Sequence, residues 1–259
     1  NNFKIVSDKK ARMILPNAIT LIGVCIGLTS IKFALDGKFA LAIIAILFAG
    51  LMDALDGRIA RLIKGTSEFG KELDSLTDFV SFGIAPAFII YFWELKNYGK
   101  IGWAITLIFS VCCVLRLARF NVFKIPENEE WKINYFQGVP SPAGGGLILL
   151  PLIYELSNFD FSFDIKFFTP YLVFLVSILL ISKIPTYSFK KITISSKLTI
   201  FLLLGIGITF VSLIFFTFKT LLIIGTGYLM MIPFSYFTYK NKNKLSNTPF
   251  KEEEHEDIL

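Results

Sequence analysis

Long apolar stretches recur along the whole chain, and they limit its possible folds more than any other feature. Stretches of about 20 apolar residues, enough for one membrane-spanning helix, follow one another with short polar breaks. The mean hydropathy is +0.64, and 54% of the residues are hydrophobic. The sequence therefore predicts an all-α, polytopic integral membrane bundle of about eight transmembrane helices. Their expected ranges are about 13–34, 39–63, 71–93, 101–119, 138–156, 167–183, 197–217 and 220–238.

The basic residues are unevenly distributed among the polar breaks. With an even number of spans both termini share one face, and most of the 26 Lys and Arg residues fall on that face. Cytoplasmic segments of membrane proteins carry such an excess, so this face is predicted to be cytoplasmic. It would attract anionic lipid headgroups and phosphorylated substrates. Most of these residues need be no more than topology signals and interfacial anchors.

The three cysteines and the single histidine contribute little to the expected chemistry. Cys25, Cys112 and Cys113 all lie in apolar stretches, so they are predicted to pack in the bundle without forming disulfides. His255 lies in the acidic segment KEEEHED, which we expect to be solvated. Histidine-based catalysis and a zinc site are therefore not expected.

Residues 51–83, LMDALDGRIARLIKGTSEFGKELDSLTDFVSFG, place four aspartates among the apolar stretches: Asp53, Asp56, Asp74 and Asp78. One aspartate near the centre of a bilayer costs about 2.5–3.5 kcal/mol on insertion scales, so four need a compensating partner. At about 100° per helical residue, the first two lie on one side of the second span. The last two lie on one stripe of the third span. Two antiparallel neighbours would thus present carboxylates to each other near the cytoplasmic surface.

Such a cluster predicts a divalent cation site. Like charges this close cannot all remain ionised without a cation, and Mg²⁺ prefers carboxylate oxygens together with substrate phosphates. Gly57 and Ala60 lack bulk on the same side, which allows a flat ligand to approach, and Arg61 is placed to hold a phosphate. Taken singly, Asp74 or Asp78 could instead be a first-turn acid that the helix dipole favours.

Written as a pattern, D-x2-D-G-x2-A-R-x8-G-x3-D-x3-D, the segment resembles the signature of the CDP-alcohol phosphatidyltransferase family. Members transfer a phosphatidyl group from CDP-diacylglycerol, or a phosphoalcohol from a CDP-alcohol, to an acceptor hydroxyl and release CMP. The resemblance implies that Asp53 and Asp74 are shared ligands of a pair of Mg²⁺ or Mn²⁺ ions and that Asp56 binds one of them. It implies that Asp78 contacts the second ion and is the general base on the acceptor hydroxyl.

The resemblance also implies a site for the nucleotide and lipid diphosphate. The residues that it places there are Gly57, Ala60, Arg61, Ser67, Asn17 and Thr20. The last two belong to the segment PNAIT (16–20), which is familiar from the family. A helix start with Pro16 in its first turn explains the same segment without any ligand.

Three downstream segments resemble the phosphatidylserine synthase branch of the family: SFGIAPA (81–87), RLARFN (116–121) and FQGVPSPAGGG (136–146). Arg116 and Arg119 end the fourth span beside the aspartates, and they could hold the serine carboxylate or the lipid diphosphate. Asn121 could hydrogen-bond the amino acid. Alternatively, the two arginines only mark the cytoplasmic end of the span, as basic residues of membrane proteins commonly do. The glycines at 144–146 would permit close helix packing.

The expected function is metal-dependent transfer of the phosphatidyl group of CDP-diacylglycerol to the hydroxyl of L-serine, giving phosphatidylserine and CMP. One alternative is a sibling transferase that uses glycerol 3-phosphate or inositol phosphate. Another is a metal-ion transporter whose acids line a pathway. Serine and the lipid are the expected substrates, and no nucleic-acid partner is expected.

The resemblance implies a six-helix catalytic core over residues 13–183. We expect a cytoplasmic segment 1–12 before it, two additional transmembrane helices within 184–238 and a charged cytoplasmic tail over 239–259. The family also implies a homodimer. We expect the protein in the inner membrane of a prokaryotic cell, surrounded by membrane lipids, with its active site facing the cytoplasm.

Overall fold

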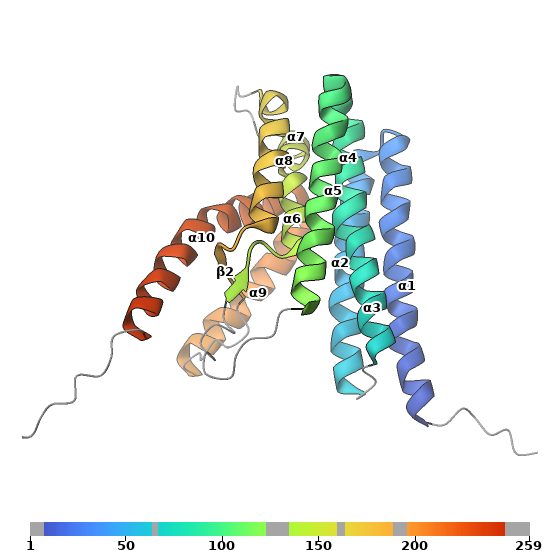
Figure 1. Cartoon of the computed structure of the whole chain (residues 1–259), viewed down its shortest axis with the longest axis vertical. Coiled ribbons are helices and arrows are strands. Elements are labelled where there is room, and N and C mark those ends of the chain that lie inside the picture. Colours follow the sequence, from blue (N-terminus) through green and yellow to red (C-terminus); the bar gives the residue numbers. More distant parts are fainter. Residues whose placement is uncertain (1–7, 64–66, 123–134, 160–163, 189–195, 247–259) are drawn as a thin grey trace, which may run out of the picture.

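The computed structural model describes residues 8–63, 67–122, 135–159, 164–188 and 196–246. Nearly all of this part of the chain is helical, and the long helices lie side by side in a bundle (Figure 1), which confirms the predicted fold class. In chain order the elements are α1 (Asp8–Leu35), α2 (Phe39–Leu62), α3 (Glu68–Asp78), η1 (Phe79–Ile84), α4 (Ala85–Trp93), η2 (Leu95–Tyr98), α5 (Gly99–Val122), β1 (Tyr135–Gln137), α6 (Ser141–Ile148), α7 (Leu150–Leu156), α8 (Ile165–Ile181), β2 (Pro185–Tyr187), α9 (Ser196–Phe215) and α10 (Thr217–Ser246).

Several helical segments are long and apolar enough to cross a membrane. Among the described residues these are Ile14–Leu35, Phe39–Leu62, Glu68–Trp93, Leu95–Val122 and Thr217–Asn241. The apolar helices Ile165–Ile181 and Thr199–Phe215 are shorter. The chain is thus an integral membrane protein, while the count of about eight spans stays a prediction. All three cysteines are free, as predicted.

The first helix begins earlier than the sequence indicates. α1 starts at Asp8, so Pro16 lies inside the helix, and the interpretation that Pro16 belongs to the first turn is wrong. Proline removes one backbone hydrogen bond but does not always end a helix. The preceding residues DKKARM include good helix formers, which favour extension of the helix beyond the apolar stretch.

The third predicted span contains a π-helical stretch, η1, directly after Asp78. Pro86 has no N–H to donate to the Phe82 carbonyl, which favours a wider turn there. α6 packs closely at the same place, because a Cβ on Gly145 would lie 2.7 Å from the Phe82 oxygen. The close packing predicted for the glycines is therefore confirmed at Gly145 and at Gly144, where a Cβ would lie 2.8 Å from Leu180 Cδ2, whereas a Cβ on Gly146 would meet nothing within 4 Å. π-Helical turns are frequent at functional sites.

A short antiparallel sheet, which the sequence did not predict, joins the start of α6 to the end of α8. Tyr135 on β1 lies opposite Tyr187 on β2. Between β1 and α6, Gly138 has a φ of +75°, a conformation that favours glycine. Its N–H donates to the Ile184 carbonyl at 2.9 Å. This connection fixes where α6 begins.

The last two helices differ in their contacts. α9 exposes most of its apolar side chains and packs mainly against α10. α10 also packs against α6, α7 and β2, and in Figure 1 it extends to the left, away from α1–α5. α10 therefore connects the C-terminal pair to the buried core, whose apolar residues come chiefly from α2, α4, α5, α6, α7 and α8.

Candidate active site

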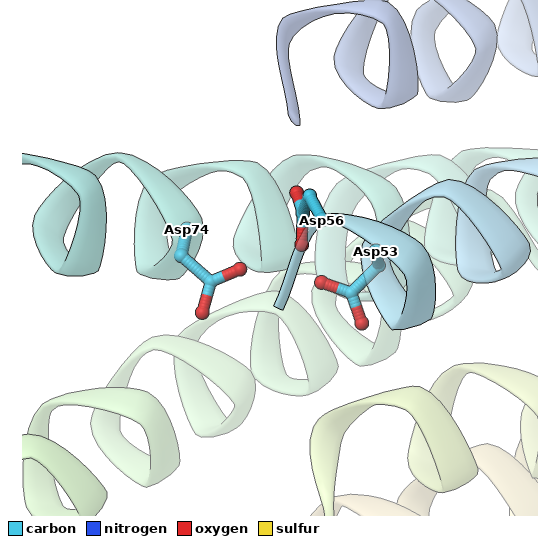
Figure 2. Close-up of side chains that lie close together, drawn as sticks. All are labelled: Asp53, Asp56 and Asp74. Atoms are coloured by element: carbon cyan, nitrogen blue, oxygen red, sulfur yellow. The ribbon is translucent and has the colours of Figure 1, made fainter. Parts of the chain in front are cut away.

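Three of the four predicted carboxylates meet between the C-terminal part of α2 and the adjacent helix α3. One oxygen each from Asp53, Asp56 and Asp74 lies within 4.8 Å of the others. Asp56 is buried and the other two are half-buried. In Figure 2, Asp56 lies between Asp53 and Asp74, and the three carboxylates approach one another. The helical spacing in the sequence predicted this meeting of the two helices.

Asp78 lies next to this group without belonging to it. It interacts electrostatically with Asp53, Asp74 and Arg116. Its Oδ1 atom is buried and has no hydrogen-bond partner in the described part of the chain. Asp78 is thus an acceptor held beside the three carboxylates and one buried cation, with one oxygen still to be satisfied.

Among the described residues, the acidic group has no directly paired counter-charge. None of its members, nor Asp78, forms an ion pair with a lysine or arginine among the described residues. Several partly buried carboxylates in one place are unfavourable without a compensating cation. Oxygen donors at this spacing fit a hard divalent ion such as Mg²⁺ or Mn²⁺. The donor set can therefore hold a divalent cation.

Residues of α1 support the acidic group from one side. The Thr20 hydroxyl lies within hydrogen-bond distance of the Asp56 carboxylate and also of the Pro16 carbonyl. Asn17 faces the beginning of α3, since a Cβ on Gly70 would lie 3.2 Å from the Asn17 Oδ1 atom. Both residues of the PNAIT segment are thus beside the acidic helices. Thr20 contacts a carboxylate directly.

Ser67 has a structural contact at the start of α3. It is the residue that caps this helix, and its hydroxyl accepts a hydrogen bond from the Gly70 N–H at 3.0 Å. A cap of this type stabilises a helix by about 1 kcal/mol. The cap alone explains a small hydroxyl residue at position 67, so contact with a nucleotide is not needed to account for it.

One side of α2 is left open beside the aspartates. A Cβ on Gly57 would meet nothing within 4 Å, so packing does not require glycine at this position. Arg61 is exposed and its Nε donates to the Gly57 carbonyl at 2.9 Å. Ala60 is half-buried between them along the helix. This side of α2 has space for a ligand and carries a cation at its end.

The two arginines of the fourth predicted span have different surroundings. Arg116 is buried, and its Nη1 donates to the Ser141 hydroxyl at 3.2 Å. Arg119 donates to the carbonyls of Leu180, Ile181 and Ser182 at 3.2, 2.7 and 3.1 Å, at the C-terminal end of α8. Arg119 therefore stabilises that helix end.

Asn121 contacts α3 through Ser75 and not through an aspartate. Its side-chain amide donates to the Ser75 hydroxyl at 2.9 Å, and both residues belong to the described part of the bundle. Ser75 directly follows Asp74 in α3. Asn121 thus links α5 to α3.

Sequence reasoning assigned no role to two polar groups near Arg116. Ser141 hydrogen-bonds it, and Tyr228 of α10 interacts with it electrostatically. Neither has a local pattern that marks it: Ser141 stands in a segment of prolines and glycines, and Tyr228 in a long apolar helix.

The fold and the acidic site together define a class of membrane transferase. The family model for CDP-alcohol phosphatidyltransferase matches residues 13–232. The chain belongs to this family, as the aspartate pattern predicted.

Curated relatives carry the name CDP-diacylglycerol–serine O-phosphatidyltransferase. One from Mycobacterium tuberculosis is 33% identical over 223 residues, which are 86% of this chain and 78% of the relative. One from Helicobacter pylori is 35% identical over 199 residues, 76% of this chain and 82% of the relative. A third, from Bacillus subtilis, is 34% identical over 142 residues, 54% of this chain and 77% of the relative.

Proposed function

We propose that this chain transfers the phosphatidyl group of CDP-diacylglycerol to the hydroxyl of L-serine, giving phosphatidylserine and CMP. The meeting of Asp53, Asp56 and Asp74 between α2 and α3 is the observation that carries this function. It provides a cation site beside an open helix side in a membrane protein of the CDP-alcohol phosphatidyltransferase family. The names of the relatives support serine as the acceptor.

The acidic residues hold the cofactor in this proposal. Asp53, Asp56 and Asp74 would bind a pair of Mg²⁺ or Mn²⁺ ions, with Asp78 beside the second ion. When bound, these ions neutralise the diphosphate of the lipid substrate and polarise the phosphorus. Thr20 holds the Asp56 carboxylate in place through its hydroxyl.

The open side of α2 receives the nucleotide part of the substrate. Gly57 leaves space there because no other group fills it. Ala60 and the exposed guanidinium of Arg61 border the same side, and Arg61 can contact a phosphate. Asn17 would approach the nucleotide from α1, where its side chain faces the start of α3 at Gly70. In this proposal Ser67 acts through the start of α3, which it caps.

Asp78 removes the proton of the serine hydroxyl. Its buried, unpartnered Oδ1 is an acceptor available for that proton. The serine oxygen forms a bond to the β-phosphorus while the bond from that phosphorus to the bridging oxygen breaks. CMP leaves with the bridging oxygen, and the proton on Asp78 is later released to water. Direct transfer is preferred because the aspartates already have roles as ligands and base.

The proposed reaction favours a site at the cytoplasmic surface of a membrane. The acyl chains remain in the bilayer while serine arrives from the cytoplasmic side, so the polar site belongs at the water interface. The inner membrane of a prokaryotic cell is the proposed location, with a homodimer as the proposed assembly. A catalytic core over residues 13–183 is part of this proposal, followed by two more transmembrane helices. The segments 1–7 and 247–259 lie outside the described residues.

The test is incubation of the purified protein with CDP-diacylglycerol, Mg²⁺ or Mn²⁺, and each acceptor in turn. CMP release with serine, and its absence after chelation, is the expected result. If CMP is released faster with glycerol 3-phosphate or inositol phosphate than with serine, the acceptor is a phosphorylated alcohol and the proposal of serine is wrong. A covalent phosphatidyl-enzyme trapped before serine is added would exclude direct transfer.

A further inference from the structure

Arg116 is a buried cation with few partners. It exposes 6% of its surface. Its hydrogen bond to Ser141 is the one that it forms within the described part of the chain, and its guanidinium also lies 5.1 Å from the centre of the Phe120 ring. A guanidinium has several N–H donors in a fixed fork. A buried cation served by one neutral hydroxyl and one ring is poorly compensated, so the site favours an anion.

Asp78 does not neutralise the Arg116 guanidinium through a direct ion pair in the described part of the chain, although the two groups interact electrostatically. Asp78 keeps one buried oxygen without a partner. A small molecule with a hydroxyl at one end and a carboxylate at the other would satisfy both groups.

Tyr228 adds a second unsatisfied group to the same place. Its hydroxyl is buried and meets no hydrogen-bond partner in the described part of the chain, and it interacts electrostatically with the Arg116 guanidinium and with the Thr186 hydroxyl. The Thr186 hydroxyl donates its proton to the Gly138 carbonyl at 2.8 Å, so toward Tyr228 it could act only as an acceptor. Buried phenol groups are normally hydrogen-bonded.

From these contacts we infer that Tyr228 and Arg116 together bind the carboxylate of the acceptor amino acid, with Ser141 holding the guanidinium in place. Arg116, Ser141 and Tyr228 are called the polar wall below. An arginine fork and a phenol hydroxyl both donate to a carboxylate. The serine hydroxyl then lies toward Asp78. This inference rests on the proposed function and names the groups that would recognise its acceptor.

The last helix is therefore part of the active site. α10 packs against α6, which carries Ser141, and against β2, which carries Thr186. The ring of Tyr228 packs against the apolar core, which orients its hydroxyl inward. The match to the family model extends to residue 232 and so includes this tyrosine.

The experiment compares two acceptors in two variants. Tyr228→Phe removes only the hydroxyl, and Tyr236→Phe is the matched control on the same helix, where the residue is 44% exposed. Acceptors are L-serine and L-serinamide, which retains the hydroxyl and amine but lacks the carboxylate. Tyr228→Phe is expected to raise the KM for serine roughly ten-fold, without changing the KM for CDP-diacylglycerol or the rate with serinamide. Tyr236→Phe should match the wild type.

Three other outcomes would overturn the inference. An equal loss with serine and serinamide would give Tyr228 a structural role, and a higher KM for CDP-diacylglycerol would place it at the lipid diphosphate. Unchanged kinetics would exclude it from the site. If Tyr228→Phe does not purify as a folded protein, Ser141→Ala should raise the serine KM alone. No transfer to serine by the wild type would instead refute the proposed function.

Discussion

The two sides of the proposed site are built in different ways. Asp53, Asp56, Asp74 and Asp78, called the acidic wall, come from two consecutive helices and one short segment of sequence. The polar wall comes from α5, α6 and α10, which are far apart in the sequence. The acidic wall depends on local helical spacing, whereas the polar wall depends on how distant helices pack.

This difference corresponds to a division of tasks. The acidic wall presents charge that a metal ion and a diphosphate can use, which is the chemistry common to the family. The polar wall presents one cation and two hydroxyl groups that can distinguish one acceptor from another. Substitutions in the acidic wall should therefore change the rate of transfer, and those in the polar wall the use of the acceptor.

The largest effect is expected for Asp78→Asn. The amide cannot take the hydroxyl proton, so the transfer rate should fall by about 10²–10⁴-fold. Binding of CDP-diacylglycerol should persist, because Asp53, Asp56 and Asp74 remain together. The measurements are CMP release at saturating serine and equilibrium binding of the lipid substrate.

The matched control is Asp36→Asn. Asp36 lies between α1 and α2, where it pairs with Lys32 on the surface, so its loss should leave transfer unchanged. Full activity in Asp78→Asn would remove this residue as the base. Loss of lipid binding in the same variant would instead give it a main role as a metal ligand.

Arg116→Lys should have the next largest effect, and it should change the KM for serine and not the transfer rate. Lysine keeps the charge but loses the fork that donates to a carboxylate. The KM for serine should rise roughly 10- to 100-fold, with a smaller change in the KM for CDP-diacylglycerol. Equal increases in the KM for serine and the KM for CDP-diacylglycerol would place Arg116 at the lipid diphosphate. The acidic wall and the polar wall would then not have separate tasks.

The sequence could predict the acidic wall because its geometry is local. Asp53 and Asp56 are separated by three residues, and Asp74 and Asp78 by four, so the helical period alone places each pair on one side. α2 and α3 both pack against α1, and carboxylates from the two helices then meet. Long apolar stretches predicted the helices in the same way, with errors at ends such as the start of α1.

Only Arg116 of the polar wall could be proposed from the sequence, because nothing local distinguishes Ser141 and Tyr228 or separates Arg116 from Arg119. Arg116 and Arg119 are three residues apart and face similar directions on α5, yet one is buried beside Ser141 and the other caps α8. Which arginine reaches which partner depends on the ends of α6 and α8. Tyr228 is one aromatic residue in an apolar helix, so only the packing of α10 shows its position.

Gly57→Ala tests whether the nucleotide lies against Gly57, because this substitution should affect substrate binding and fold stability in opposite directions. A Cβ at this position meets no protein atom within 4 Å. Alanine in a helix interior should therefore stabilise the fold by roughly 0.5–1 kcal/mol. If the nucleotide lies against Gly57, the KM for CDP-diacylglycerol should nevertheless rise about ten-fold, because the added methyl group crowds it.

Gly207→Ala is the matched control for this change. Gly207 also has nothing within 4 Å of an added Cβ, but it lies on α9, away from the acidic wall. It should give the same gain in thermal stability with unchanged kinetics. If both variants keep the wild-type KM, the nucleotide does not approach α2 at Gly57.

The smallest effect on activity is expected for Arg119→Ala. Its guanidinium donates to three carbonyls at the end of α8. Removing it should lower the free energy of unfolding by about 2 kcal/mol and Tm by roughly 4–8 °C, with the serine KM unchanged. Arg58→Ala, at an exposed position on α2, is the control for lost surface charge. A raised KM for serine with an unchanged Tm would show that Arg119 contributes mainly to serine binding and not to capping of α8. Arg119 would then belong to the polar wall.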